Sequence, residues 1–154
     1  MKQVILEAEG RVTPVSSKSH ISYKFYLGQP GGKLWISFVY EPKLLEDRDL
    51  AKKMIMDSID KYTEADQRER IQAKWESFLP LKNLITVSVD DPEGHRGAGH
   101  RHDPEQLLFL SEDAASPGLV RGRILPGMWG VTLSIHAVIT NSCRYKLQLH
   151  HEEE

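Results

Sequence analysis

The sequence has little cysteine and no strong excess of either charge. Its single cysteine, Cys143, has no second thiol with which to form a disulfide, which favours a reducing compartment. The 20 basic and 22 acidic residues leave a formal net charge of −2, so composition gives no general attraction to nucleic acid or to membranes. We therefore expect a cytoplasmic protein with neither a nucleic-acid partner nor a membrane partner.

Long apolar runs and catalytic signatures are also missing. The apolar run from Val4 to Leu6 ends at Glu7, and no later window approaches the roughly 18 apolar residues of a membrane span. The glycines Gly94, Gly97 and Gly99 are not framed by a strand and a helix, as a nucleotide-binding loop requires. No nucleophile elbow or Ser–His–Asp order is present. The sequence therefore shows no enzyme active site and predicts no cofactor.

Alternation of apolar and polar residues predicts β-strands. The apolar members with the same parity are Ile21, Tyr23, Phe25 and Leu27; Leu34, Ile36, Phe38 and Tyr40; Trp129, Val131, Leu133 and Ile135; and Tyr145, Leu147 and Leu149. Further strands are expected before the acidic turn at Asp90-Asp91, after a Gly- and His-rich loop, and over 119–125 between two Pro-Gly turns. One buried and one solvated face are typical of a sandwich. We expect one mostly β domain over 1–154, an antiparallel jelly-roll-like β-sandwich of about eight strands, with 150–154 a solvated tail.

A helical insert is predicted over about 45–79. Asp47 is placed to cap a helix, and Pro80 ends the segment. Apolar residues at helical spacing are Leu50, Met54, Ile55, Ile59 and Tyr62, followed by Ile71, Trp75, Phe78 and Leu79. Such a stripe must pack against the sandwich or against another subunit. We expect a homo-oligomer or a protein partner to use this insert.

Several stretches resemble the N-terminal accessory β-sandwich of metallohydrolases that have a polymerase-and-histidinol-phosphatase (PHP) type catalytic domain. They are NLITVSVDDPEGHRGAGHRH (83–102), SPGLVRGRILPGMWGVTLSIHAV (116–138), CRYKL (143–147) and GGKLWISFVY (31–40). The acidic turn followed by a Pro-Gly-x-Trp strand entry is more loosely similar to pre-peptidase C-terminal-type sandwich domains. In the PHP family a catalytic domain with a His-x-His pair follows the sandwich. Here His100-Arg-His102 lies inside the sandwich portion, so the resemblance implies an accessory domain and carries over no catalytic residue.

Histidines around one loop are candidate metal ligands. Three of them, His95, His100 and His102, lie close together in sequence, and His136 is on a strand that could pass nearby. Imidazole suits zinc, manganese or iron. The spacing on a single glycine-rich loop is a weak match to a zinc site, and interleaved arginines repel a cation. The alternative is a surface loop whose side chains bond the acidic turn.

Arginines in and after the same loop are candidate ligands of a small anion, because guanidinium forks match phosphate or carboxylate. This set comprises Arg96, His100, Arg101, Arg121 and Arg123. In the alternative, Arg121 and Arg123 alternate on the exposed face of a strand and pair with carboxylates. Trp35 and Tyr26 have the parity opposite to the core and suggest either sugar stacking or cover by the insert.

These patterns favour a non-catalytic binding or assembly module, related to the accessory domain of PHP-type metallohydrolases. A metal-dependent hydrolase that uses the histidine loop of 95–102, with a divalent metal such as zinc or manganese, is the alternative.

Overall fold

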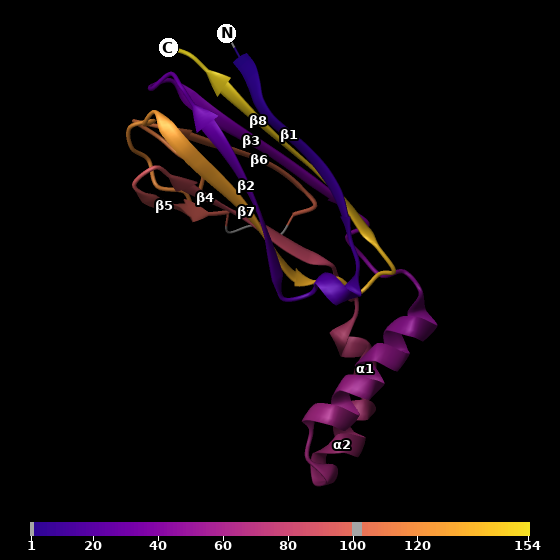
Figure 1. Cartoon of the computed structure of the whole chain (residues 1–154). Helices are drawn as coiled ribbons and strands as arrows, with labels where there is room; N and C mark the ends of the chain where they lie inside the picture. Colours follow the sequence, from indigo (N-terminus) through magenta and orange to yellow (C-terminus); the bar gives the residue numbers. More distant parts are fainter. Residues whose placement is uncertain (1, 100–102) are drawn as a thin grey trace.

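Two four-stranded antiparallel sheets face each other in the computed structural model, which describes residues 2–99 and 103–154 (Figure 1). The first sheet has the order β1 (Lys2–Val12), β8 (Cys143–Glu152), β3 (Lys33–Glu41), β6 (Glu105–Ser111). The second has the order β2 (Ser19–Leu27), β7 (Gly127–Ala137), β4 (Leu84–Asp91), β5 (Gly94–Ala98). Strands β1–β4 thus alternate with strands β5–β8 within each sheet, and these eight antiparallel strands confirm the predicted β-sandwich.

The alternating residues form the core between the sheets. The three-strand set predicted on β3, β7 and β8 is buried: Leu34, Ile36, Phe38, Tyr40, Trp129, Val131, Leu133, Ile135, Tyr145, Leu147 and Leu149. Trp129 stacks on Phe25 with ring centroids 6.3 Å apart and donates its Nε1–H to the carbonyl of Leu125 at 2.8 Å. Burying one such large apolar side chain stabilises the fold by about 1.5–3 kcal/mol. The period-two pattern therefore identified the inward face correctly.

The C-terminal end is part of the sheet. Strand β8 runs to Glu152, and His151 is 3% exposed, with its Nε2 2.8 Å from the carbonyl oxygen of Gly31. His151 pairs with Gln3 of β1 on one side and with Leu34 of β3 on the other. The expectation of a solvated tail from residue 150 was wrong, because two neighbouring strands supply backbone partners there.

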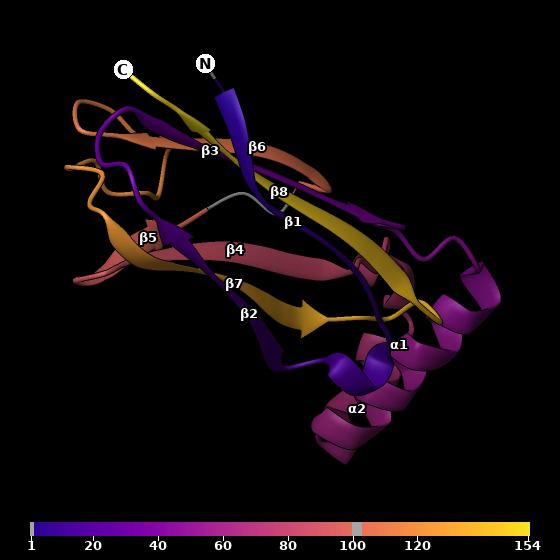
Figure 2. The same cartoon turned by 45° about the horizontal axis from the view of Figure 1, so that its top comes forward.

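The helical insert lies beyond one end of the sandwich, away from both chain termini (Figures 1 and 2). It consists of α1 (Arg48–Tyr62), α2 (Ala65–Gln72) and the short 3-10 helix η2 (Trp75–Phe78); another 3-10 turn, η1 (Pro14–Ser16), joins β1 to β2. The Asp47 side chain accepts a hydrogen bond from the Leu50 amide at 3.0 Å, so Asp47 is the N-cap as predicted. None of the described helices combines the length and apolar character required to cross a membrane.

A buried asparagine fastens the base of the insert to the sandwich. Asn83 is fully buried, and its Nδ2 donates to the carbonyl of Pro42 and to Oγ1 of Thr140, both at 2.8 Å. Its Oδ1 accepts from the Ile139 amide at 2.7 Å. Nearby, Leu44 and Lys82 form an isolated β-bridge. The chain therefore enters and leaves the insert through adjacent points.

Candidate functional site

The turn between β4 and β5 is organised by Asp91. Its Oδ1 accepts hydrogen bonds from the amides of Glu93 at 2.7 Å and Gly94 at 2.9 Å. Aspartate favours such turns because its short side chain reaches the backbone two or three residues ahead. The other Asp91 oxygen, Oδ2, is therefore left to face β5, where it meets Arg96.

Arg96 is the most highly bonded side chain of the predicted site. Its residue is 7% exposed, and its guanidinium lies 5.6 Å from the centre of the Trp129 ring. The guanidinium donates to Asp91 Oδ2 (2.9 Å) and to the carbonyls of Val120 (2.9 Å), Gly122 (3.0 Å) and Arg123 (3.1 Å). A fork with five N–H donors suits such an arrangement. Arg96 therefore binds the protein's own groups rather than facing solvent.

The hydrogen bonds of Arg96 explain the conformation of segment 119–126. The sequence predicted a strand here, but the structure has a loop with one isolated bridge, between Gly97 and Leu119. The carbonyls that a neighbouring strand would use are turned toward the Arg96 guanidinium instead. Within the described part of the chain, Arg121 and Arg123 are exposed and form no ion pair, so the expected pairing with carboxylates is absent.

The Asp91–Arg96 pair is buried, with each side chain 8% exposed. Burial favours the neutral form of Asp91, but the hydrogen bonds from Arg96 and from the amides of Glu93 and Gly94 outweigh it and lower its pKa. The carboxylate is consequently held in its charged form. The pair holds together the β4–β5 turn and the loop 119–126.

The structure separates the candidate histidines that it describes. His95 is exposed on β5, with Nδ1 3.1 Å from Asp90 Oδ1. His136 is exposed on β7, with Nε2 2.8 Å from Thr86 Oγ1. Thr86 and Asp90 are four residues apart on β4, which corresponds to roughly 13 Å along a strand. His95 and His136 therefore do not share a metal site.

The remaining candidates, His100, Arg101 and His102, lie outside the described residues. Within residues 2–99 and 103–154, no three His, Cys, Asp or Glu side chains come close enough together to hold a metal ion. The alternative in which histidines bond the acidic turn is observed for His95 and Asp90.

An apolar groove opens on the helical insert. It has a volume of about 490 Å³ and is lined by Met54, Ile55, Ser58, Ile59, Tyr62, Thr63, Ile71, Phe78, Leu81 and Ile139. Ile55 and Ile59 form its floor at 5% exposure each, whereas Tyr62 and Phe78 remain 75% and 51% exposed. The predicted stripe is thus only partly covered by the protein itself.

The outward aromatic residues do not lie under the insert. Trp35 is half-buried on the first sheet, where its Nε1–H donates to Glu152 Oε2 at 2.7 Å and its ring lies 5.6 Å from that of Phe109. Lys2 Nζ lies 4.4 Å from the same ring. Tyr26 is 68% exposed on the second sheet. Because the insert extends from the end of the sandwich, it covers neither residue (Figure 1).

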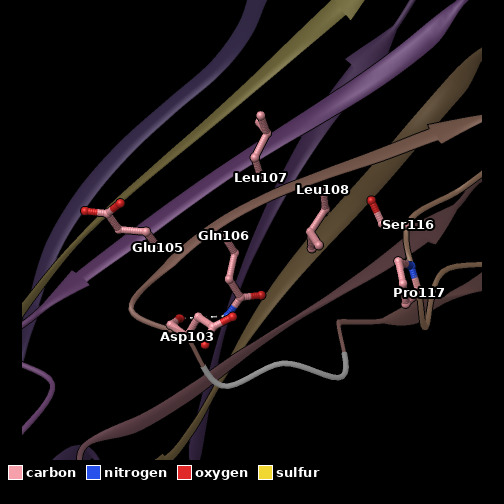
Figure 3. Close-up of a pocket in the computed structure, with 7 residues that line it drawn as sticks. All are labelled: Asp103, Glu105, Gln106, Leu107, Leu108, Ser116 and Pro117. Atoms are coloured by element: carbon pink, nitrogen blue, oxygen red, sulfur yellow. Dashed lines mark hydrogen bonds between the residues drawn. The ribbon is translucent and has the colours of Figure 1, made fainter.

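A smaller hollow of about 190 Å³ lies beside β6 (Figure 3). Gln106 donates from Nε2 to the carbonyl of Asp103 at 3.1 Å, and its Oε1 is buried with no hydrogen-bond partner among the residues that the structure describes. That oxygen faces Gly99, where an added Cβ would lie 3.2 Å from it. Because Oε1 is closed off from solvent, the hollow does not offer it to a ligand, and we assign no role to this pocket.

Three ionisable groups near the insert are constrained by burial. Burial raises the pKa of Tyr40 to about 12 and raises that of the Cys143 thiol. Burial, together with the charge of Lys82, lowers the pKa of Lys43, whose Nζ donates to Tyr40 Oη at 2.7 Å and to the Asn83 carbonyl at 2.9 Å. These groups hold the strand end in place, and a thiol with a raised pKa is a poor nucleophile.

No family model and no curated protein matches the chain. A crystal structure of a protein from Sulfurospirillum deleyianum aligns with 97% of this chain and 99% of its own chain, at 9% sequence identity and a TM-score of 0.32. At that TM-score the likeness carries no argument about fold or function.

Proposed function

We propose that the protein is a non-catalytic binding and assembly module, in which the apolar groove of the helical insert is the docking surface. The main observation in support of this proposal is a groove of about 490 Å³ whose aromatic rim, Tyr62 and Phe78, remains exposed. Large exposed apolar patches on a protein surface commonly mark interaction sites. The insert also projects from the sandwich, where a second molecule can reach it (Figure 2).

The occupant that we propose is the same surface of a second copy. A two-fold interface must supply both the projecting side chains and the hollow that receives them. Here the exposed rings of Tyr62 and Phe78 and the floor formed by Ile55 and Ile59 belong to one patch. Aromatic side chains set in such a patch typically contribute most of the binding energy of an interface.

The relation to the accessory sandwich of PHP-type metallohydrolases is part of this proposal, as is a cytoplasmic location. The first is supported by the sandwich with its helical insert, and the second by the buried free thiol of Cys143. Neither requires chemistry from the histidines.

Sedimentation across a range of protein concentrations tests the docking role. The double variant Tyr62→Ser/Phe78→Ser is expected to weaken self-association about a hundredfold, because a two-fold interface contains each changed side chain twice. The control variant Tyr26→Ser/Met128→Ser removes side chains of matching exposure, 68% and 51%, from the second sheet and should leave association unchanged. A wild-type protein that is monomeric up to its solubility limit, with the groove side chains freely reactive to solvent probes, contradicts the proposal.

A further inference from the structure

The loop 119–126 carries two exposed arginine residues. Arg121 and Arg123 are exposed, and across the described residues neither pairs with a carboxylate. Arg121 Nη1 donates a hydrogen bond to the carbonyl of Asp113 at 3.2 Å. Only Gly122 separates the two arginines in the sequence. Their like charges repel, and a bound anion would relieve this repulsion.

The backbone of the loop adds donors on its outer side. The carbonyls of Val120, Gly122 and Arg123 face the Arg96 guanidinium. In a planar trans peptide the N–H points opposite to the C=O, so the amides of the residues that follow are turned away from Arg96. These are the amides of Arg121, Arg123 and Ile124, and none of them has a hydrogen-bond partner among the residues described. Ile124 is 2% exposed, so only the amides of Arg121 and Arg123 belong to exposed residues. By contrast, the Gly122 amide donates to the Ser111 carbonyl at 3.1 Å.

From these observations we propose that this loop binds the phosphate group of a small molecule. The guanidinium groups of Arg121 and Arg123 supply charge-assisted forks, and the amides of the same two residues supply neutral donors. A phosphate dianion offers three terminal oxygens and two charges, which matches this donor set better than a carboxylate does. The site lies on a different surface from the insert groove and does not depend on it.

Arg96 acts in this site as a positioning residue. Its charge is compensated by Asp91 at 2.9 Å, and its remaining donors hold three loop carbonyls. It therefore fixes the direction of the peptides without contacting the anion. This assigns different roles to the three described arginines that the sequence had grouped together.

A second exposed arginine pair provides a control without free backbone donors, and Glu41 of β3 lies opposite one of its members, Arg144. Arg11 on β1 and Arg144 on β8 are cross-strand partners, and both are exposed. The backbone of Arg144 belongs to an interior strand that pairs on both sides. If positive charge alone attracted phosphate, this pair would bind it as well as the loop does.

The experiment is a titration of the ¹⁵N-labelled full chain with inorganic phosphate at pH about 8, where the dianion predominates. Ionic strength is held constant, and acetate is titrated in parallel. We expect saturable shifts of the Arg121 and Arg123 amides with phosphate and far weaker ones with acetate. Arg121→Ala/Arg123→Ala should weaken binding at least tenfold, whereas Arg11→Ala/Arg144→Ala should not change it. Glycerol phosphate in a third titration separates an ester ligand from free phosphate by its relative affinity.

Retaining the charge tests the role of the forks. Arg121→Lys/Arg123→Lys should bind phosphate several-fold more weakly than the wild type, because lysine lacks the planar fork. Equal binding by this variant, unchanged binding by the alanine variant, or equal responses to acetate and phosphate would each overturn the proposal.

Discussion

The carboxylate of Asp91 lies 2.9 Å from the guanidinium of Arg96 across the β4–β5 turn, and the remaining donors of Arg96 connect this turn to the distant loop 119–126. Asp91 closes the β4–β5 turn, while Arg96 also holds the carbonyls of Val120, Gly122 and Arg123. A buried charge that loses its partners is costly, because neither water nor protein then solvates it. The pair therefore links the stability of the turn to the conformation of the loop.

Replacing Arg96 by lysine should destabilise the fold by about 3 kcal/mol. Lysine keeps the charge but cannot reach four acceptors, so several loop carbonyls lose their donors. Urea unfolding monitored by tryptophan fluorescence measures the change, with Arg144→Lys on the exposed sheet face as the control. A loss no larger than that of the control would mean that the network is not required.

The free energy of unfolding should decrease at acid pH because the Asp91 carboxylate becomes protonated. Its pKa is lowered in the fold, so its contribution is complete above the unfolded value of about 3.9 and is lost as pH falls through the lower folded value. The free energy of unfolding, measured from pH about 6 downward, should show this decline. Asp91→Asn should be less stable at neutral pH and have a shallower acid slope, whereas Asp66→Asn on α2 should retain the wild-type slope. An unaltered slope in Asp91→Asn contradicts the assignment.

Asn83→Ala should cost about 3 kcal/mol, because it leaves buried groups of Pro42, Thr140 and Ile139 without their partners. Asn141 is exposed and provides the matched control, so Asn141→Ala is expected to be nearly neutral. Thermal and urea unfolding of both variants check the difference. Similar losses for the two variants would show that Asn83 does not anchor the insert.

Gly97→Ala should destabilise the protein by about 3 kcal/mol. Gly97 has φ +106°, and a Cβ there would lie 2.2 Å from the carbonyl oxygen of Gly118. Gly28→Ala is the control, because its Cβ would meet only the Tyr26 ring at 3.6 Å, an ordinary contact. Comparable unfolding midpoints for the two variants would argue against the close approach of β5 and the loop.

Metal content distinguishes the proposed module from the alternative hydrolase. Protein purified without a metal-affinity step should contain far less than one equivalent of zinc, manganese or iron, and His100→Ala/His102→Ala should be as stable as the wild type. Near-stoichiometric metal that disappears in this variant would restore the hydrolase hypothesis, since a catalytic metal needs fixed ligands and an open position.

The sequence was sufficient to predict the sandwich and its insert. Alternation placed Leu34 to Tyr40 and Trp129 to Ile135 on the inward faces, and Asp47 marked the start of α1. These signals are local, since each depends on side-chain parity or on a cap within one element. The long edge strand β1 was not identified because Glu7 interrupts its apolar residues and most of its side chains are not fully buried.

Features that depend on distant partners could not be predicted in the same way. The residues of 119–125 alternate like those of a strand, yet a single side chain, Arg96, takes the place of the neighbouring strand. Part of the stretch expected as a loop forms strand β5. The Asp91 side chain closes a tight turn directly before it, and this turn brings β5 back alongside β4. The five-residue Asp–Arg spacing across that turn was the available signal, but many surface pairs share it.

The adjacent entry and exit of the insert, marked by the bridge between Leu44 and Lys82, have a consequence for how this protein can change over time. Residues 45–81 can be lengthened, shortened or exchanged by recombination without shifting the register of any strand pair. The sequence of the insert can therefore diversify while the sandwich that carries it stays constant.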